Sequence, residues 1–76
     1  MNIMKKFAVA YHINSGTNGI YFVSCNDKSD LTEDVLEELT FKETRDKNVP
    51  RVVVHASTDY MIEEIGEDMK SPYSIQ

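Results

Sequence analysis

The chain has 76 residues, of which 41% are apolar, 28% charged and 9% aromatic, and this composition is typical of one small globular domain. A chain of this length buries only about 60–65% of the surface that its unfolded form exposes, so a large enzyme cleft is not expected. Thirteen acidic residues against eight basic residues give a net charge of −5. Because a phosphate backbone is repelled by that charge, composition disfavours direct binding to nucleic acid.

Cysteine content and the N-terminal sequence favour a cytoplasmic protein. The single cysteine, Cys25, cannot form an internal disulfide, and the even cysteine set of a small secreted scaffold is missing. The stretch FAVAYHINSG is too short and too polar for a signal peptide or a membrane span. We therefore expect no contact with a membrane, and one α+β domain over residues 1–70 followed by a frayed tail over residues 71–76.

The first part of the chain predicts a β-hairpin. Apolar residues alternate with others over residues 5–13, the period of a strand. Residues 14–19 are nearly all turn formers and end in an Asn-Gly pair, and a run rich in β-branched and aromatic residues follows over residues 20–25. These features favour two antiparallel strands joined by a tight turn.

Two registers of this hairpin stay open. Pairing Ile13 with Ile20 sets Tyr11 opposite Phe22. A slip of one residue turns the other face of the second strand to that side. The residues of this second face are Tyr21, Val23 and Cys25.

A helix is predicted to follow, starting near Asp30. Asp30 and Glu33 have the spacing of a capping box, and acidic residues in the first turn suit the helix dipole. The run from Asn48 to Pro50 ends the helix. Its apolar stripe is formed by Leu31, Val35, Leu36 and Leu39, with Phe41 near its end.

The rest of the chain predicts a third strand and a second helix. Residues 51–56 are rich in valine and should form the strand, whereas residues 58–70 carry apolar residues at helical spacing and should form a short helix. The expected fold class is α+β: a three-stranded, mainly antiparallel sheet of order 2-1-3, covered by one helix, with a short C-terminal helix (ββαβα). We predict that its core includes Val9, Leu36, Leu39 and Val54.

No motif in the sequence specifies catalysis or a cofactor. A glycine-rich phosphate loop, a Cys-x-x-Cys pair, a His-Glu-x-x-His and a Gly-x-Ser-x-Gly are all missing. In one register His12, Cys25 and His55 could supply three zinc ligands, but surface histidines and a buried cysteine explain them better. We therefore expect no enzyme, no cofactor and no metal site.

The charge pattern instead suggests a surface that binds a protein partner. Residues 1–25 carry a net charge of +2, residues 26–49 carry −4 and residues 50–76 carry −3. Such carboxylates either imitate the phosphates of a nucleic acid toward a basic protein surface or simply form a solvated face. On the first interpretation, the partner-binding residues are Glu33, Glu37, Glu38, Tyr60, Met61, Glu63, Glu64 and Glu67.

The order of segments also carries a resemblance. MKKFAVAYHI, a glycine-containing turn, IYFVSC, the helix entry LTEDVLEEL and the stretch VPRVVVHAS together resemble small uncharacterised β-β-α-β accessory proteins of bacteriophages and mobile elements, over residues 4–57. The resemblance implies an accessory protein that binds and blocks a host protein, and it carries over no site residue.

The expected function is therefore that of a non-enzymatic, small acidic binding protein. The partner would be a host protein that the chain inhibits or modulates, for example a nucleic-acid-binding or defence protein. The alternative is a homodimeric structural or regulatory protein with no inhibitory role, which would bury its open sheet face between two copies.

Overall fold

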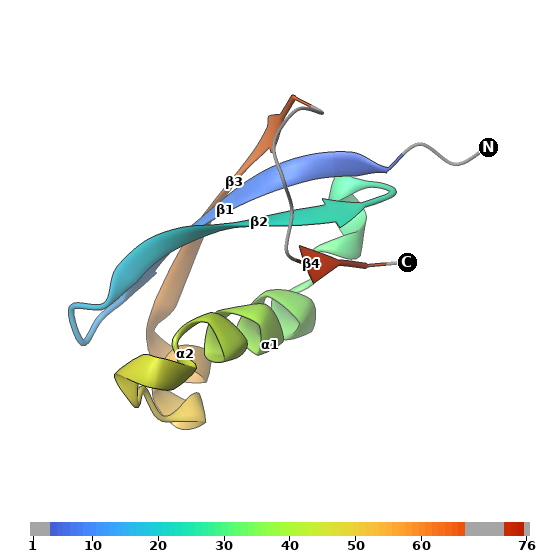
Figure 1. Ribbon diagram of the computed structural model, residues 1–76. Coiled ribbons are helices and arrows are strands. Elements are labelled where there is room, and N and C mark those ends of the chain that lie inside the picture. Colours follow the sequence, from blue (N-terminus) through green and yellow to red (C-terminus); the bar gives the residue numbers. More distant parts are fainter. Residues whose placement is uncertain (1–3, 67–72, 76) are drawn as a thin grey trace.

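The computed structural model describes residues 4–66 and 73–75 and contains one mixed sheet with two helices against one of its faces (Figure 1). The strand order is β3-β1-β2-β4. Strand β1 pairs antiparallel with both β2 and β3, and β2 pairs parallel with β4. The elements in chain order are β1 (Lys5–Ile13), β2 (Asn18–Cys25), the 3₁₀ turn η1 (Lys28–Asp30), α1 (Glu33–Glu43), the 3₁₀ turn η2 (Arg45–Lys47), α2 (Arg51–Ser57), β3 (Thr58–Ile65) and β4 (Tyr73–Ser74).

The α+β class is confirmed, whereas the details of the predicted sheet differ. A third strand does lie antiparallel beside β1, but residues 58–65 form it instead of residues 51–56. A fourth strand, Tyr73–Ser74, pairs with β2 inside the stretch for which the sequence predicts a frayed tail. Over residues 4–66 and 73–75 the sheet therefore has four strands in mixed orientation, where the sequence predicts three.

The hairpin turns Tyr21, Val23 and Cys25 to the core face, as the slipped alternative does, but its strands are shifted by three residues from the Ile13–Ile20 pairing, so neither predicted register is the observed one. Val9 pairs with Tyr21 and Phe7 pairs with Val23, so one face of both strands carries large apolar side chains. At the turn, Gly16 has a φ of 102°, a conformation that favours glycine, and its N–H donates to the Ile13 carbonyl at 2.8 Å. The buried residues of this face are Phe7, Val9, Tyr11, Ile13, Tyr21, Val23 and Cys25.

Helix α1 begins later than the sequence suggests. Asp27 caps η1, forming a capping box with Asp30, and Thr32 is the N-cap of α1, its hydroxyl accepting from the Val35 N–H at 3.3 Å. The acidic pair that predicts the helix start is thus divided between two elements. After α1 the chain turns through η2, and Asn48 takes a left-handed conformation with a φ of 57°.

The prediction of a strand over residues 51–56 is wrong, because this segment is helix α2. Pro50 supplies the first turn: its carbonyl accepts from the Val53 and Val54 N–H groups. Only Val54 is buried, while Val52 is 70% exposed. Packing of one side of the segment against α1 therefore overrides the strand preference of its valines.

A matched pair of variants, Val54→Ala and Val52→Ala, tests whether residues 51–57 are helical. Val54→Ala removes buried methyl groups and should destabilise the protein by about 1–3 kcal/mol. Val52→Ala changes an exposed position, so it should be neutral or stabilise the protein by up to about 0.5 kcal/mol, because alanine is the better helix former. Urea denaturation measures both. A loss of stability in Val52→Ala would favour a strand, since valine is preferred there.

The predicted helix over residues 58–70 is also wrong where the structure describes it. Residues 58–65 form β3, in which exposed Asp59, Met61 and Glu63 alternate with half-buried Thr58 and Tyr60. The alternation has the period of a strand, and pairing with β1 satisfies the backbone on one side. Residues 67–70 lie outside the described residues.

The core lies between the sheet and α1, and it includes the four predicted residues Val9, Leu36, Leu39 and Val54. A buried polar contact joins the two layers: the Tyr21 hydroxyl lies 3.0 Å from Thr40 Oγ1 and donates to the Leu36 carbonyl at 3.3 Å. Burial raises the pKa of Tyr21 well above its ordinary value. The phenol therefore stays protonated and holds the sheet to the helix.

Candidate functional site

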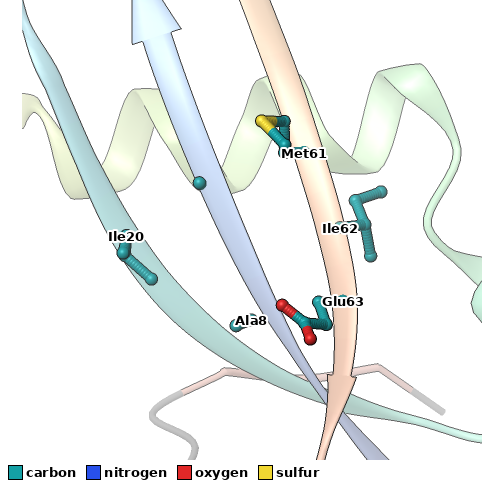
Figure 2. A pocket seen from close by; sticks show the side chains of 6 residues that line it. Ala8, Ile20, Met61, Ile62 and Glu63 are labelled. Carbon is teal, nitrogen blue, oxygen red and sulfur yellow. The ribbon is translucent and has the colours of Figure 1, made fainter.

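The face of the sheet that points away from the helices carries an apolar groove of about 330 Å³ (Figure 2). The small side chains of Ala8 and Ala10, on the central strand β1, form the bottom of this groove. Ile20 of β2 and Met61 of β3 pair with Ala10 on either side, and they are 60% and 76% exposed. The lining residues, which define the apolar groove, are Ala8, Ala10, Ile20, Met61, Ile62 and Glu63.

A second, smaller hollow of about 120 Å³ lies where the start of α1 meets α2 and β3. Three carboxylates from two successive turns of α1 face it, and the Tyr60 and Thr58 side chains of β3 close the other side. Its lining residues, which define the acidic notch, are Glu33, Asp34, Glu37, Val54, His55, Thr58 and Tyr60.

The pKa of Tyr60 reflects both its burial and the charges of the notch. Burial raises the pKa of its phenol above the ordinary value, and the charges of Glu37 and Glu33 raise it further, while the neighbouring Thr40 and Thr58 hydroxyls oppose the rise. Negative potential therefore reaches the surface of β3. The notch is a place where a cationic group would gain Coulomb energy.

Part of the acidic surface is already neutralised by α2. Arg51 lies 2.7 Å from Glu38 and 3.9 Å from Glu37, and its guanidinium stacks 4.3 Å from the centre of the Phe41 ring. His55 Nδ1 also contacts a Glu37 carboxylate oxygen. Glu37 and Glu38 thus hold the two helices together, whereas the structure gives no ion pair to Glu33 or Asp34 among the described residues.

The Glu37–His55 contact predicts a specific pH dependence. The hydrogen bond to Glu37 and its charge raise the pKa of His55 above the ordinary value. A raised pKa in the folded state means that this stabilisation is complete below the pKa of the unfolded chain and is lost as the pH rises through the folded pKa. Glu37→Gln should therefore lower the pKa of His55, which an NMR titration of its ring protons measures. An unchanged midpoint would contradict the contact.

The predicted partner-binding residues fall into separate groups. The notch contains Glu33, Glu37 and Tyr60. The groove contains Met61 and Glu63. They lie on the opposite face from Tyr60, because neighbouring residues of a strand point to opposite faces. Of the others, Glu38 pairs with Arg51, Glu64 is exposed on β3, and Glu67 lies outside the described residues.

Several lining residues do not follow from the sequence interpretation. His55 and Thr58 enter the notch only because residues 51–57 are helical and turn directly into β3. Ala8, Ala10 and Ile20 form the groove only in the observed register, in which Ala10 pairs with Ile20. The signal that could have indicated the groove is the pair of alanines between large apolar residues in the first strand, since small side chains on a central strand leave a depression.

The three candidate zinc ligands lie on different parts of the fold. His12 lies on β1 and is exposed, Cys25 is buried in the core, and His55 lies on α2. Burial raises the pKa of the Cys25 thiol, and the charge of Asp30 adds to this, so the reactive thiolate is disfavoured. Within residues 4–66 and 73–75 no group of three metal-ligating side chains is found, and no helix is long and apolar enough to cross a membrane.

Comparisons with known proteins give no further guide. No family model, no curated protein sequence and no solved structure matches the chain. The resemblance to phage accessory proteins therefore stays a prediction. The two surfaces on either side of β3 are the features of the molecule that point to a function.

Proposed function

We propose that this chain is a non-enzymatic binding protein that covers a basic surface of another protein. The observation that carries the proposal is the pairing of negative charge with exposed apolar surface on one strand. In β3, the acidic residues Asp59, Glu63 and Glu64 accompany Met61, which is 76% exposed. Acidic side chains attract and orient a basic partner, and the apolar contact slows its release.

The resemblance to accessory proteins of phages and mobile elements supports a narrower form of the proposal. In that form the partner is a cytoplasmic host protein, such as a nucleic-acid-binding or defence protein, which the chain inhibits or modulates by blocking its basic surface. The net charge of −5 and the carboxylates of the notch support a mechanism in which they take the place of a phosphate backbone.

Affinity capture from a bacterial lysate, read by quantitative mass spectrometry, tests the proposal. The bait is compared with the double variant Glu33→Gln/Glu64→Gln and with Asp46→Asn, an exposed acidic residue of η2 outside both surfaces. A basic protein should be enriched by the bait and the Asp46 control, and lost from the double variant and in high salt. Equal enrichment by all three baits, or enrichment of no protein, would contradict the proposal.

The second candidate function is self-association through the apolar groove, and its support is the exposure of Ile20 and Met61 on an open sheet face. Sedimentation velocity over a range of concentrations decides it. A dimer should dissociate in Met61→Glu and persist in Val52→Glu, a matched change on α2 away from the groove. A protein that stays monomeric at the highest concentration excludes this candidate.

A further inference from the structure

Among the residues that the structure describes, no strand pairs with the outer edge of β3. In the order β3-β1-β2-β4, the neighbour of β3 among the described residues is β1, on one side only. An edge strand presents a row of backbone N–H and C=O groups to the other side, and an extended segment can pair with them. Every residue of Thr58–Ile65 is half-buried or exposed, so the sheet ends there in contact with solvent.

The charge of β3 selects what can pair with it. The strand carries Asp59, Glu63 and Glu64 and no basic residue. Beyond it on the helix side lie Glu33 and Asp34 in the acidic notch, to which the structure gives no ion pair among the residues that it describes. A neighbouring strand rich in lysine or arginine would be complementary to this edge.

A second copy of β3 is a poor occupant of the same edge. Symmetric antiparallel pairing of the strand with itself centred on Met61 sets Asp59 of one copy opposite Glu63 of the other, twice in each dimer. Like charges directly opposite each other destabilise a strand pair. The acidic residues thus protect the edge against self-pairing and leave it open to a basic segment.

The two faces beside β3 also differ. Side chains of an added strand alternate between the faces of the sheet. One set would lie next to Tyr60 and approach the acidic notch, and the other would lie next to Met61 and approach the apolar groove. An added strand that alternates basic with apolar residues would therefore match both faces at once.

We propose that the free edge of β3 binds an extended basic segment of the partner protein by strand addition, with lysine or arginine side chains toward the acidic notch and apolar side chains toward the groove. The inference rests on the proposed function and deepens it by naming the element of the partner that is bound. Backbone hydrogen bonds supply the hold, and the carboxylates on both sides of β3 supply the selection for basic sequences.

The test uses a blocked, fluorescently labelled peptide of alternating lysine and valine, as long as β3, titrated with the full chain at low salt. Two further peptides carry N-methyl groups, one on the valines and one on the lysines, so that each loses the N–H groups of one edge and keeps its charge. A fourth peptide alternates glutamate and valine. Fluorescence anisotropy measures binding, and hydrogen exchange with mass spectrometry locates it.

We expect the lysine peptide to bind, one N-methylated peptide to bind at least about tenfold more weakly through the loss of its backbone bonds, and the glutamate peptide not to bind. Binding should slow exchange of the β3 amides, and Glu33→Gln in the acidic notch should weaken it severalfold, whereas Asp46→Asn should leave it unchanged. The inference is overturned if the lysine peptide does not bind, or if both N-methylated peptides bind as tightly as the parent.

These failures are separable from failure of the proposed function. Equal binding of all three lysine peptides, with dependence on salt, leaves an acidic surface that attracts basic proteins without strand addition. A second outcome also overturns the strand addition alone. In it, a lysate protein is captured by the Asp46→Asn bait and lost from the Glu33→Gln/Glu64→Gln bait, but no peptide binds. Loss of that distinction in the lysate overturns the proposed function itself.

Discussion

Replacing Leu39 by alanine is expected to lower the free energy of unfolding by about 2–5 kcal/mol, because the substitution leaves a cavity under the sheet. Leu39 is only 7% exposed and packs in the single core that β1, β2 and α1 share. A domain of this size has a total stability of about 4–11 kcal/mol, so the variant would lose a large part of it. Thermal melting followed by circular dichroism measures the effect.

The control for this prediction is Lys42→Ala, an exposed position in the same helix. Alanine and lysine have similar helix propensities, so this variant should melt close to the parent. For Leu39→Ala, a loss of this size should lower Tm by at least about 8 °C. A melting temperature within a degree or two of the parent would mean that α1 does not pack on the sheet as the structure has it.

The parts of the fold that follow from the sequence are those in which local preference and packing agree. In β1, alternation of apolar residues and burial on one face indicate the same strand. In α1, Leu36 and Leu39 have helical spacing, and both are buried. The boundaries are less predictable, because Asp30 belongs to the cap of η1 and Thr32 begins the helix instead.

The second half of the chain could not be predicted because its local preferences oppose the final packing. The valines of α2 favour a strand, but Pro50 starts a helix there, and Arg51 and His55 then reach Glu38 and Glu37 of α1. In β3, the apolar residues fit a helical stripe as well as a strand, and only pairing with β1 decides between them. Such long-range contacts are not encoded in a short window of sequence.

The wrong prediction of a helix over residues 58–70 also limits what the sequence indicates about the site. It indicates acidic residues and the segment around Tyr60 and Met61 as a binding surface, and the structure places these two residues in separate hollows on opposite faces of β3. A helix over residues 58–70 would have joined them with Glu63 and Glu64 on one exposed surface. The open edge of β3, which carries the proposed strand addition, exists only because that segment is a strand.

Replacing Gly19 by alanine is expected to destabilise the protein, although the residue lies in a strand, where glycine is usually the weaker choice. A Cβ built on Gly19 would lie 2.7 Å from Oη and 3.0 Å from Cζ of Tyr11, its partner across the hairpin. The ring has little room to move, because Tyr11 is 4% exposed and its centroid lies 5.9 Å from that of Tyr21. Overpacking of this kind costs about 1–3 kcal/mol.

The entropy that alanine removes from the unfolded chain offsets about 0.4–1 kcal/mol of this cost, so the net loss should be about 1 kcal/mol, within a range of about 0–2.5 kcal/mol. Gly66→Ala is the matched control, because a Cβ there meets no atom within 4 Å. In a Tyr11→Leu background, which removes the ring, Gly19→Ala should become neutral or stabilising, and urea denaturation of the four chains gives the coupling energy. If Gly19→Ala costs the same with and without the ring, the close approach of Tyr11 to Gly19 is not what requires glycine at this position.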